Sequence, residues 1–549
     1  MKELIKKYFE EFSAVESNIK SFNDFVDFRL QALIDELNTQ IDPSLGLRLG
    51  KITVGKPTIT EADGSRKALF PFEARLRKIT YAAPVYLEIN IQKGSEKEFF
   101  NARICDLPIM VKSKYCHLAG MDKEELIKNY EDPVDPGGYF ILNGNERVLV
   151  MIEDLAPNQP FVEKDSAGNI SARLFSEKGS YRIPLSILES KDGELQISFT
   201  RFKNLPVIPV IKAFGLVKDS EIFQEIGKQY DSLIVNLYAY TNLQKENDAL
   251  MFLAEKMNLS GAKPDLITRI ISRLDNFLLP HIGTDKESRK TKARTLCKLI
   301  KQLLRVIKDG KPVDDKDHYL NKRIRLSGDM LTDLFRINLS ILSRDMQHTL
   351  ERYSKKKRFY SAKSIVKPAL LSRRVESAMA TGSWIGEKKG ITQNIQRTNY
   401  LDLLSQLQRV VSLLPSEQEN FKARTLHPTQ FGRLCPVETP EGTPIGLRKN
   451  LAILARISTA VNVDESVILK VLEDAGMIKP GMQLEEQHTD LFLNGKSIGK
   501  VSSAQEFTNE LREKRRKGEL PLETSIYFDA DKDAVFISTG VGRLLRPLI

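Results

Sequence analysis

Two groups of closely spaced aspartates are the residues of this chain best suited by type to bind a metal ion. Asp529, Asp531 and Asp533 have the opening spacing of a calcium-binding loop, but Ala534 stands where the sharp turn of that loop requires glycine. Gly540 also stands where the loop needs a bidentate glutamate. The flanking segments SIYF and AVFI instead predict a hairpin with the aspartates in its turn.

The second acidic group, Asp314, Asp315 and Asp317, precedes a basic segment. Its carboxylates have a spacing that could hold magnesium, but short acidic side chains are also favoured at turns, where they accept hydrogen bonds from free backbone N–H groups. We interpret them as turn-capping residues. His318 and His427 have no visible nucleophile partner, and the chain has no P-loop, Rossmann, HExxH or GxSxG motif. The motifs therefore predict no catalytic residue and no metal site in this chain.

Hydrophobic periodicity predicts several helices. Residues 1–45 and most of 220–310 have apolar residues at helical spacing, and residues 321–379 are again helical and basic. Residues 400–414 predict a further helix. The strongest case is residues 288–308, where one face is apolar and the opposite face carries lysine and arginine; the apolar residues are Leu296, Leu299, Ile300, Leu303, Leu304 and Ile307.

Other segments have the pattern of short strands. Alternating apolar residues predict strands over 51–92 and 157–215. Asn143-Gly144, between two apolar runs, predicts a tight hairpin turn, because both residues tolerate a positive φ. Strands and helices alternate again after residue 452. The chain is therefore expected to fold as a multidomain α+β protein with mixed helices and short antiparallel sheets.

Length, charge and cysteines narrow the classes of protein. The 549 residues predict three or four domains, and a net charge of +11 with a pI near 9.1 suits a polyanionic partner. No run of about 18 apolar residues predicts a membrane span. The four cysteines form no CxxC pair and indicate a reducing compartment, so a cytoplasmic location is expected; they are Cys105, Cys116, Cys297 and Cys435.

The most informative segment is RTLHPTQFGRLCPVETPEGTPIGLRKNLA, residues 424–452, which we call the proline-rich loop. Proline lacks an N–H and glycine has no side chain to pack, so this segment predicts neither a helix nor a ladder strand. Its leucines, isoleucine and cysteine argue against disorder. An ordered irregular segment of this length is typical of a functional loop. The interrupting residues are Pro428, Gly432, Pro436, Pro440, Gly442, Pro444 and Gly446.

This loop also carries a family resemblance. HPTQFGRLCPVETPEGTPIGLRKNLA (427–452) resembles the ETPEG signature of the second-largest subunit of multisubunit DNA-directed RNA polymerases. Further segments resemble the same family in its order, so the resemblance covers nearly the whole chain from about residue 50. They are PFEARLRKITYAAPVYLEI (71–89), LPIMVKSKYCHLAG (107–120), GGYFILNGNERVLV (137–150), LLPHIGTDKESRKTKARTL (278–296), DDKDHYLNKRIRLSGDMLTDLFR (314–336) and TNYLDLLSQLQRVVS (398–412).

The segments LPHIG and DKDHYLNKR are closer to the archaeal and eukaryotic branch of this family than to the bacterial one. The chain stops after VGRLLRPLI (541–549), before the part that contacts nucleotide and metal in this family. It therefore resembles the B″ polypeptide of archaea, the N-terminal half of a subunit divided between two genes. An engineered truncation would have the same appearance.

The resemblance implies a division into four domains, one of them built from two separated segments. The expected ranges are an N-terminal helix (1–14), the protrusion (15–155 and 335–385), the lobe (156–334), the fork (386–460) and the start of an external domain (461–549).

The resemblance also implies a function, a subunit of the DNA-dependent RNA polymerase that is a nucleotidyltransferase only as part of the complex. The chain would form one wall of the DNA cleft and the fork, with Mg²⁺ bound mainly by the largest subunit. The implied partners are the complementary C-terminal half, the largest and other polymerase subunits, the DNA template and the RNA–DNA hybrid. The alternative is a non-catalytic nucleic-acid-binding or scaffold protein derived from the same family.

Individual residues take roles from this resemblance. Residues 413–422 correspond to a loop near downstream strand separation. Glu441 is expected near the incoming nucleotide, while Glu438 is expected there or holding a neighbouring arginine; both could instead only cap turns. Thr443 is also expected near the active centre, although relatives often have a longer amide side chain there. The expected nucleic-acid-binding residues are Arg397, Arg409, Arg424, Arg433 and Lys449.

Overall fold

The computed structural model of the chain describes residues 2–93, 96–165, 167–179, 181–227, 230–259, 261–356, 365–384, 389–459, 464–479 and 488–546. The chain divides into two compact units, each built from separated segments. Unit 1 comprises 1–154, 323–460 and 541–549, and unit 2 comprises 155–322 and 461–540.

The chain passes from unit 1 to unit 2 close to the expected end of the first protrusion segment at residue 155. It returns after residue 322, whereas the expected end of the lobe at residue 334 falls inside a long helix, α12 (Ser327–Lys356). The mixed helices and short sheets confirm the expected multidomain α+β class. The four-domain division stays a prediction.

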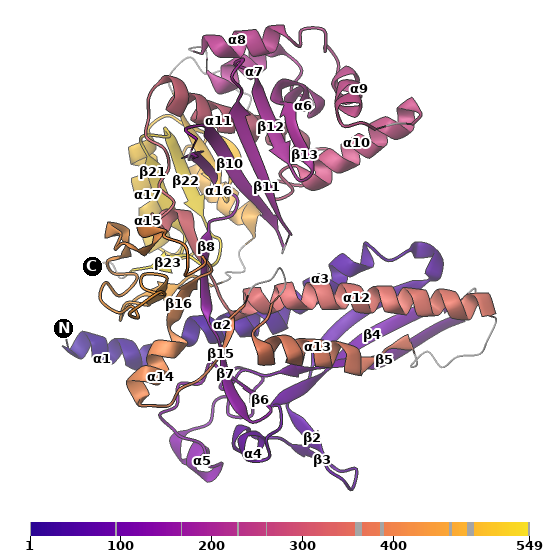
Figure 1. The fold of residues 1–549 in the computed structure, drawn as a ribbon, viewed down its shortest axis with the longest axis vertical. Helices are drawn as coiled ribbons and strands as arrows, with labels where there is room; N and C mark the ends of the chain where they lie inside the picture. The colour runs from indigo at the N-terminus through magenta and orange to yellow at the C-terminus, as the bar shows by residue number, and fades with distance from the viewer. Residues whose placement is uncertain are drawn as a thin grey trace. The chain divides into compact units, whose positions relative to one another are not determined.

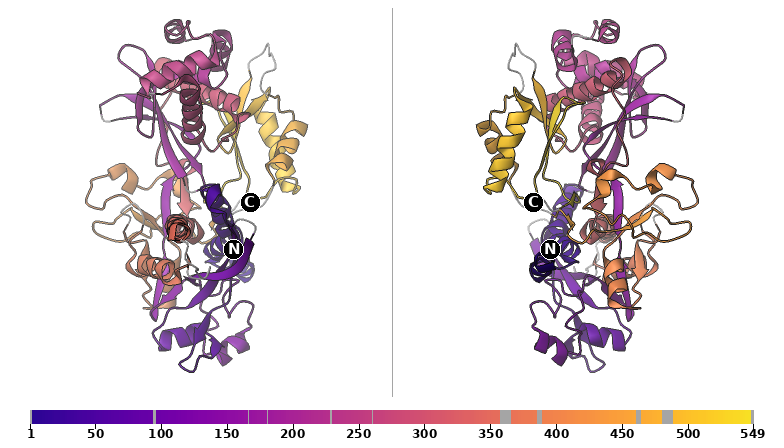
Figure 2. Two further views of the ribbon diagram at one scale, coloured as in Figure 1. Left: turned by 90° about the vertical axis from the view of Figure 1, so that its right-hand side faces the viewer. Right: turned by 90° about the vertical axis from the view of Figure 1, so that its left-hand side faces the viewer.

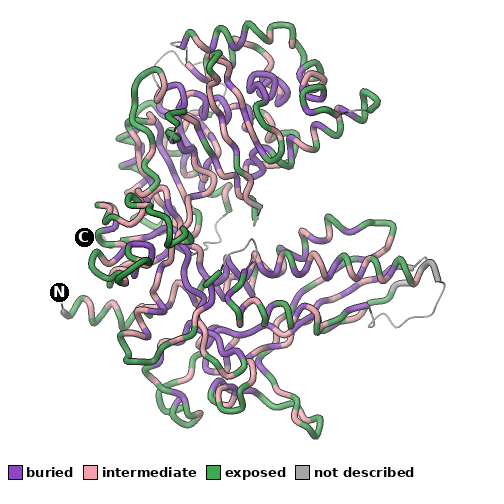
Figure 3. The backbone as a smooth tube through the Cα atoms, viewed as in Figure 1, coloured by how far each residue is buried: buried purple, intermediate pink, exposed green. Residues whose placement is uncertain are grey.

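Unit 1 is built around a three-stranded antiparallel sheet with strand order β1-β4-β5. Buried and half-buried residues alternate along β4, because successive side chains of a strand point to opposite faces (Figure 3). Helices α12 and α13 lie next to each other, with α13 packed on β5 (Figure 1). The bounds are β1 Leu47–Val54, β4 Ala82–Lys93, β5 Glu96–Pro108 and α13 Pro368–Thr381.

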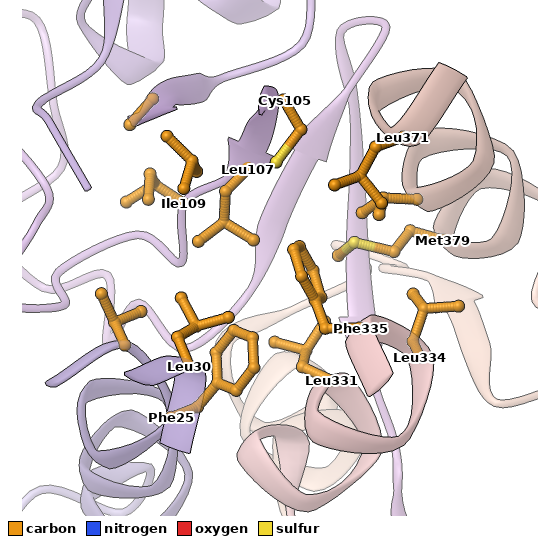
Figure 4. Close-up of a cluster of buried hydrophobic side chains, with 14 of the residues drawn as sticks. Phe25, Leu30, Cys105, Leu107, Ile109, Leu331, Leu334, Phe335, Leu371 and Met379 are labelled. Atoms are coloured by element: carbon orange, nitrogen blue, oxygen red, sulfur yellow. The ribbon is translucent and has the colours of Figure 1, made fainter. Parts of the chain in front are cut away.

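The expected helical N-terminus is confirmed, with one turn of π-helix inside it. Its buried residues meet those of α12 and α13 in the core of unit 1 (Figure 4). Phe25 contacts Phe335 edge-on at 5.4 Å between ring centroids, a geometry that suits the quadrupoles of the two rings. The elements are α1 Lys2–Glu11, α2 Glu16–Asp24, η1 Phe25–Arg29, α3 Leu30–Asn38 and η2 Pro43–Leu45.

The hairpin expected at Asn143-Gly144 is confirmed. Leu142 pairs with Asn145, and the two turn residues have φ of 50° and 77°. The strands belong to a small sheet of order β15-β7-β6. The remaining elements of this region are β2 Thr58–Thr60, β3 Arg66–Ala68, α4 Pro71–Leu76, α5 Lys123–Lys128, β6 Phe140–Leu142, β7 Asn145–Leu149 and β15 Thr392–Asn394.

The helix expected over 400–414 is wrong at its C-terminal end. Helix α14 covers Tyr400–Leu407, and the chain then forms strand β16, Arg409–Ser412. β16 is parallel to β8 and antiparallel to β17, in a sheet of order β14-β8-β16-β17. The β-branched pair Val410-Val411 favours a strand once two partner strands are available. The partner strands are β8 Met151–Leu155, β14 Lys322–Arg325 and β17 Arg448–Asn450.

Unit 2 contains a five-stranded antiparallel sheet of order β13-β12-β11-β10-β9, which confirms the strands expected over 157–215 as far as Pro206. Beyond that residue the expectation is wrong, because the chain forms helix α6. The mainly helical region that follows is also confirmed. The bounds are β9 Pro160–Lys164, β10 Ile170–Lys178, β11 Tyr181–Glu189, β12 Leu195–Phe199, β13 Phe202–Pro206, α6 Val207–Ala213, α7 Asp219–Ile226, α8 Asp231–Tyr238, α9 Glu246–Lys256, α10 Lys263–Phe277, α11 Ser288–Lys308 and η3 Tyr319–Asn321.

A second sheet of unit 2 has the order β20-β19-β22-β21, with helices α16 and α17 on one side of it (Figure 2). The hairpin expected around Asp529, Asp531 and Asp533 is confirmed, since Asp529 pairs with Ala534. The bounds are α16 Glu465–Asp474, β19 Thr489–Leu493, β20 Lys496–Val501, α17 Ala504–Arg516, β21 Ser525–Asp529 and β22 Ala534–Ser538.

Helix α11 has the bounds that its periodicity predicts, and two lysines outside its apolar stripe are also buried. Lys292 is fully buried and donates to the carbonyl oxygen of Asp275 at 2.7 Å. Burial lowers the pKa of Lys292 to about 8. Lys298 is also buried and pairs with Asp490 at 2.9 Å. Helical periodicity predicts the apolar stripe of α11. It does not predict the burial of Lys292 and Lys298, because the segments that cover them, around Asp275 and Asp490, lie elsewhere in the sequence.

Candidate functional site: the proline-rich loop

The proline-rich loop is ordered, but it is not free of regular structure as expected. It contains the 3₁₀ turn η5, Pro428–Gln430, and ends in strand β17, which pairs with β16. Short α15, Phe421–Arg424, leads into it. The remaining backbone is tied at several points, for example by the Cys435 N–H, which donates to the Asn450 carbonyl at 2.8 Å. The expectation of no ladder strand is therefore wrong for its last residues, which contain neither proline nor glycine.

Lys449 lies on the inner side of this short sheet. It is opposite Val410, which is fully buried, and directly paired residues project from the same face. Its ammonium group is 3.1 Å from a carboxylate oxygen of Glu153, with only 7% and 6% of the two side chains exposed. Lys449 is thus part of a buried ion pair inside unit 1.

Arg424 connects two loops through main-chain carbonyl groups. Its Nη1 donates to the carbonyl oxygens of Thr443 at 2.6 Å and Ile445 at 2.9 Å. Its Nη2 donates to those of Ser416 at 2.8 Å and Gln418 at 3.2 Å. Four carbonyls from two irregular segments therefore converge on one guanidinium, whose planar fork of donors suits such a cluster.

The backbone approaches most closely at Gly446. This residue has φ of +72°, and an added Cβ would lie 2.3 Å from the Arg424 carbonyl oxygen. Gly442 also has a positive φ, +82°, but an added Cβ there would meet nothing within 4 Å. The Thr439 hydroxyl completes the turn, because it donates to the Arg448 carbonyl at 3.0 Å and accepts from the Gly446 N–H at 2.9 Å.

Arg433 and Arg397 are also bonded within unit 1. Arg433 donates to the carbonyl oxygens of Thr429 at 3.0 Å and Leu544 at 3.2 Å. Burial, followed by the nearby charge of Arg546, lowers the pKa of Arg433. These bonds join the proline-rich loop to the last described strand, β23, whose bounds are Leu544–Leu545 and which pairs with β18, Arg456–Ile457.

Arg397 belongs to a network of charged groups. It is 2.5 Å from Glu146 and 2.7 Å from Asp135, and these two hydrogen bonds raise its pKa against the opposing effect of burial. The buried Tyr139 hydroxyl accepts from Arg397 at 3.1 Å and from Arg75 at 2.8 Å. The network therefore joins the segment before α14 to the hairpin β6–β7.

Arg409 has a different environment from the other predicted cations. Within the described residues it forms no hydrogen bond or ion pair, and Arg448 lies on the same face of the sheet, since Arg409 pairs with Asn450 and Val411 with Arg448. Burial and then the Arg448 charge lower the pKa of Arg409. Sequence reasoning missed Arg448. Successive side chains of a strand point to opposite faces, so a strand predicted at β17 would have placed Arg448 on the other face of the sheet from Lys449.

The two glutamates of the loop differ, because Glu438 accepts a hydrogen bond and Glu441 forms none with the described residues. The Ser405 hydroxyl donates to Glu438 at 2.5 Å and accepts from the Asn450 amide at 2.9 Å. Glu441 is exposed and has no hydrogen bond or ion pair to the rest of the described chain. The side chain of Thr443 is exposed as well, while its carbonyl is held by Arg424. The structure therefore presents Glu441 and Thr443 outward from a fixed backbone.

The surface of the loop and its neighbours also exposes several apolar side chains. The exposed fractions reach 70% at Phe421 and 83% at Val437. The others in this region are Leu401, Leu426, Phe431, Ile445 and Ile453.

Three family models match the chain. The model of the RNA polymerase beta subunit matches residues 13–373, Rpb2 domain 3 matches 393–457, and Rpb2 domain 4 matches 491–549. The first model alone covers more than half of the chain. The chain belongs to the RNA polymerase beta subunit family. The proline-rich loop lies within the domain 3 match.

Curated relatives of this family have two lengths. The DNA-directed RNA polymerase subunit Rpo2 of Saccharolobus solfataricus is 38% identical over 100% of this chain and 50% of its own length. This chain therefore spans about half the length of the Rpo2 relatives it matches. The subunit Rpo2N of Methanocaldococcus jannaschii is 39% identical over 87% of this chain and 99% of its own. The subunit Rpo2N of Halobacterium salinarum is 36% identical over 89% of this chain and 98% of its own length.

Proposed function

We propose that this chain is a subunit of an archaeal DNA-directed RNA polymerase, in which the proline-rich loop forms part of the fork beside the active centre. The observation that carries this proposal is the ordered loop itself, present in a chain that matches the Rpo2N of Methanocaldococcus jannaschii over 99% of that protein's length. Arg424 and Thr439 fix the backbone of that loop, so that its outward side chains have defined positions.

The proposal includes the extent of the chain and its partners. We assign the chain to the B″ part of a divided second-largest subunit, supported by its alignment with Rpo2N and with half of Rpo2. The proposed partners are the complementary C-terminal half, the largest subunit, the other polymerase subunits, the DNA template and the RNA–DNA hybrid. The family's division into protrusion, lobe, fork and external domain is part of the same proposal, as is a cytoplasmic location. None of the described helices is both long and apolar enough to cross a membrane.

In the assembled enzyme, two Mg²⁺ ions would align the reacting groups for phosphoryl transfer. Among the described residues, no group of three or more histidine, cysteine, aspartate or glutamate side chains is placed to hold such an ion. We assign the ions mainly to the largest subunit and no catalytic step to this chain. Its share is to form one wall of the DNA cleft and to shape the fork.

Within the fork, we assign different tasks to the predicted residues. Glu441 is the residue best placed to act near the incoming nucleotide, with Thr443 beside it, because both are exposed on a fixed backbone. Glu438 holds the loop through Ser405. Arg409 is the predicted cation best suited to contact phosphate, while Arg397, Arg424, Arg433 and Lys449 shape the site through the bonds described above.

The proposal is tested by reconstituting the polymerase from this chain, its complementary half and the other subunits. We expect the chain to co-purify with the largest subunit, and Glu441→Ala to slow elongation at least severalfold without preventing assembly. Glu124→Ala, an exposed position on α5, is the matched control and should elongate normally. A chain that binds nucleic acid but never assembles would favour the alternative of a non-catalytic binding or scaffold protein. Normal elongation by the Glu441 variant would remove its proposed role.

A further inference from the structure

A second surface of unit 1, away from the proline-rich loop in sequence, has the features of a ligand groove. It has a volume of about 740 Å³ and lies along helix α13, with Asn338 of the neighbouring helix α12 also in its lining (Figure 1). We call it the α13 groove. Its lining residues are Asn338, Lys367, Ala369, Leu370, Arg373, Arg374, Ser377, Ala378, Thr381 and Ser383.

The lining of the α13 groove contains three cations and no carboxylate. Lys367 is paired with Asp345 at 3.1 Å. Arg373 and Arg374 are exposed and make no hydrogen bond or ion pair with any described residue. A solvated helix face usually mixes both signs of charge. The groove therefore presents two guanidinium groups that are unpaired within the described part of the chain. No carboxylate is among its lining residues, and the neighbouring Asp345 is paired with Lys367.

Its remaining lining suits close approach of a polar chain. Ser377, Ala378 and Thr381 follow Arg374 at helical spacing, so small side chains and the arginine share one face. Thr381 donates its hydroxyl to the Ser377 carbonyl, which leaves its oxygen able to accept, as it does from the Ser383 N–H at 3.2 Å. None of the described lining residues is aromatic, so these residues favour contact with a backbone over stacking with a base.

The N-terminus of α13 adds to the positive potential of the groove. The helix has 14 residues and begins at Pro368, and its N-cap residue, Lys367, provides no side-chain cap. The first backbone N–H groups of a helix carry a partial positive charge that favours anions. Ala369 and Leu370, which line the groove, belong to this first turn. The dipole therefore favours an anion at the end of the groove lined by Ala369 and Leu370, while Thr381 and Ser383 line the end at the helix C-terminus.

We propose that the α13 groove binds the phosphodiester backbone of a nucleic acid, through Arg373 and Arg374 and without reading base sequence. Guanidinium groups match phosphate oxygens in geometry and charge, and contacts to the backbone alone position a strand without selecting its sequence. This inference extends the proposed function, because it places a polyanion contact on the segment before the fork.

The test measures binding of the full chain to a fluorescent duplex and to a single strand, each of about 25 nucleotides per strand, between about 50 and 200 mM KCl. For the duplex, Arg373→Gln/Arg374→Gln should reduce the slope of log K against log salt by about 2, since each phosphate contact contributes about 0.9. For the single strand, the same double variant should reduce this slope by about 1.4. The form of nucleic acid for which the variant loses more of its affinity at a fixed salt concentration is the preferred ligand.

The matched control is Arg66→Gln/Lys67→Gln, which removes two exposed cations from the β2–β3 hairpin of the same unit. It should leave the slope unchanged. An equal loss in both double variants would mean that net charge alone matters, and no loss in the α13 variant would mean that the groove does not contact phosphate; either result overturns the proposal. Fluorescence of Trp384, the single tryptophan, verifies that each variant is folded.

A cross-linking readout locates the contact independently. A photoreactive group on Ser377→Cys should cross-link to the bound DNA, whereas the same group on exposed Thr58→Cys should not. Cys435, the one cysteine that is not buried, is first replaced by serine to remove the background. Absence of the Ser377 cross-link contradicts the proposal. Cross-linking by a chain that fails to assemble into a polymerase would leave the groove intact and refute only the proposed function.

Discussion

The proline-rich loop and the α13 groove are both basic regions of unit 1, but their cations are used differently. In the loop, Arg424 holds four carbonyl oxygens and Lys449 is buried against Glu153. In the groove, Arg373 and Arg374 have no partner among the described residues. A basic side chain in the sequence therefore does not by itself identify a contact with phosphate.

The difference follows from the backbone of each region. A helix such as α13 satisfies its own carbonyl groups, so its arginines remain available to a ligand. An irregular loop leaves carbonyl groups without ladder partners, and buried or half-buried carbonyls need a donor. Arginine can supply several donors at once. The loop thus uses its cations to hold its own shape.

The largest expected effect is on stability, and it distinguishes a cation that holds the fold, Lys449, from one that is available to a ligand, Arg373. Lys449→Ala should lower the free energy of unfolding of unit 1 by about 3–5 kcal/mol, because it leaves the Glu153 carboxylate buried without its cation. Arg373→Gln should change it by less than about 0.5 kcal/mol. Urea unfolding followed by Trp384 fluorescence measures both. The double variant Lys449→Met/Glu153→Leu should recover most of the loss; a single variant as stable as the parent chain would show that the pair is not structural.

Sequence patterns predicted the elements that depend on local periodicity or turn chemistry. Helix α11 and the hairpin at Asn143-Gly144 have the predicted positions. Strand β16 was predicted as helix because it forms only when β8 and β17, distant in sequence, are beside it. The hydrogen bonds of Arg424 could not be predicted for the same reason, since their acceptors are carbonyls that every residue has. The burial of Lys449 follows from strand alternation once β17 is known.

A smaller effect is expected from two glycines of the loop that differ in their surroundings. Gly442→Ala should destabilise the loop by about 1 kcal/mol through the left-handed backbone alone. Gly446→Ala should destabilise the loop by about 1–3 kcal/mol more than Gly442→Ala, because its Cβ would overlap the backbone of Arg424. That backbone cannot move freely, since the Arg424 side chain is bonded to the loop. Cleavage by a glutamate-specific protease at Glu438 and Glu441 measures local opening of the loop. Equal cleavage rates in the two variants would contradict the close packing of Gly446 against Arg424.

A further small effect distinguishes an arginine that positions the loop from one that contacts phosphate. Arg424→Lys keeps the charge but replaces a planar fork with one ammonium group, which cannot hold four carbonyls of two loops. We expect a loss of about 1–2 kcal/mol in local stability, seen as faster cleavage at Glu417 and Glu419, and the same loss in Arg424→Ala. The salt slope of DNA binding should remain unchanged in both variants. If Arg424→Lys instead retained normal cleavage and only Arg424→Ala reduced the salt slope, Arg424 would belong with Arg373 and Arg374 as a ligand of phosphate, and the contrast between the two regions would disappear.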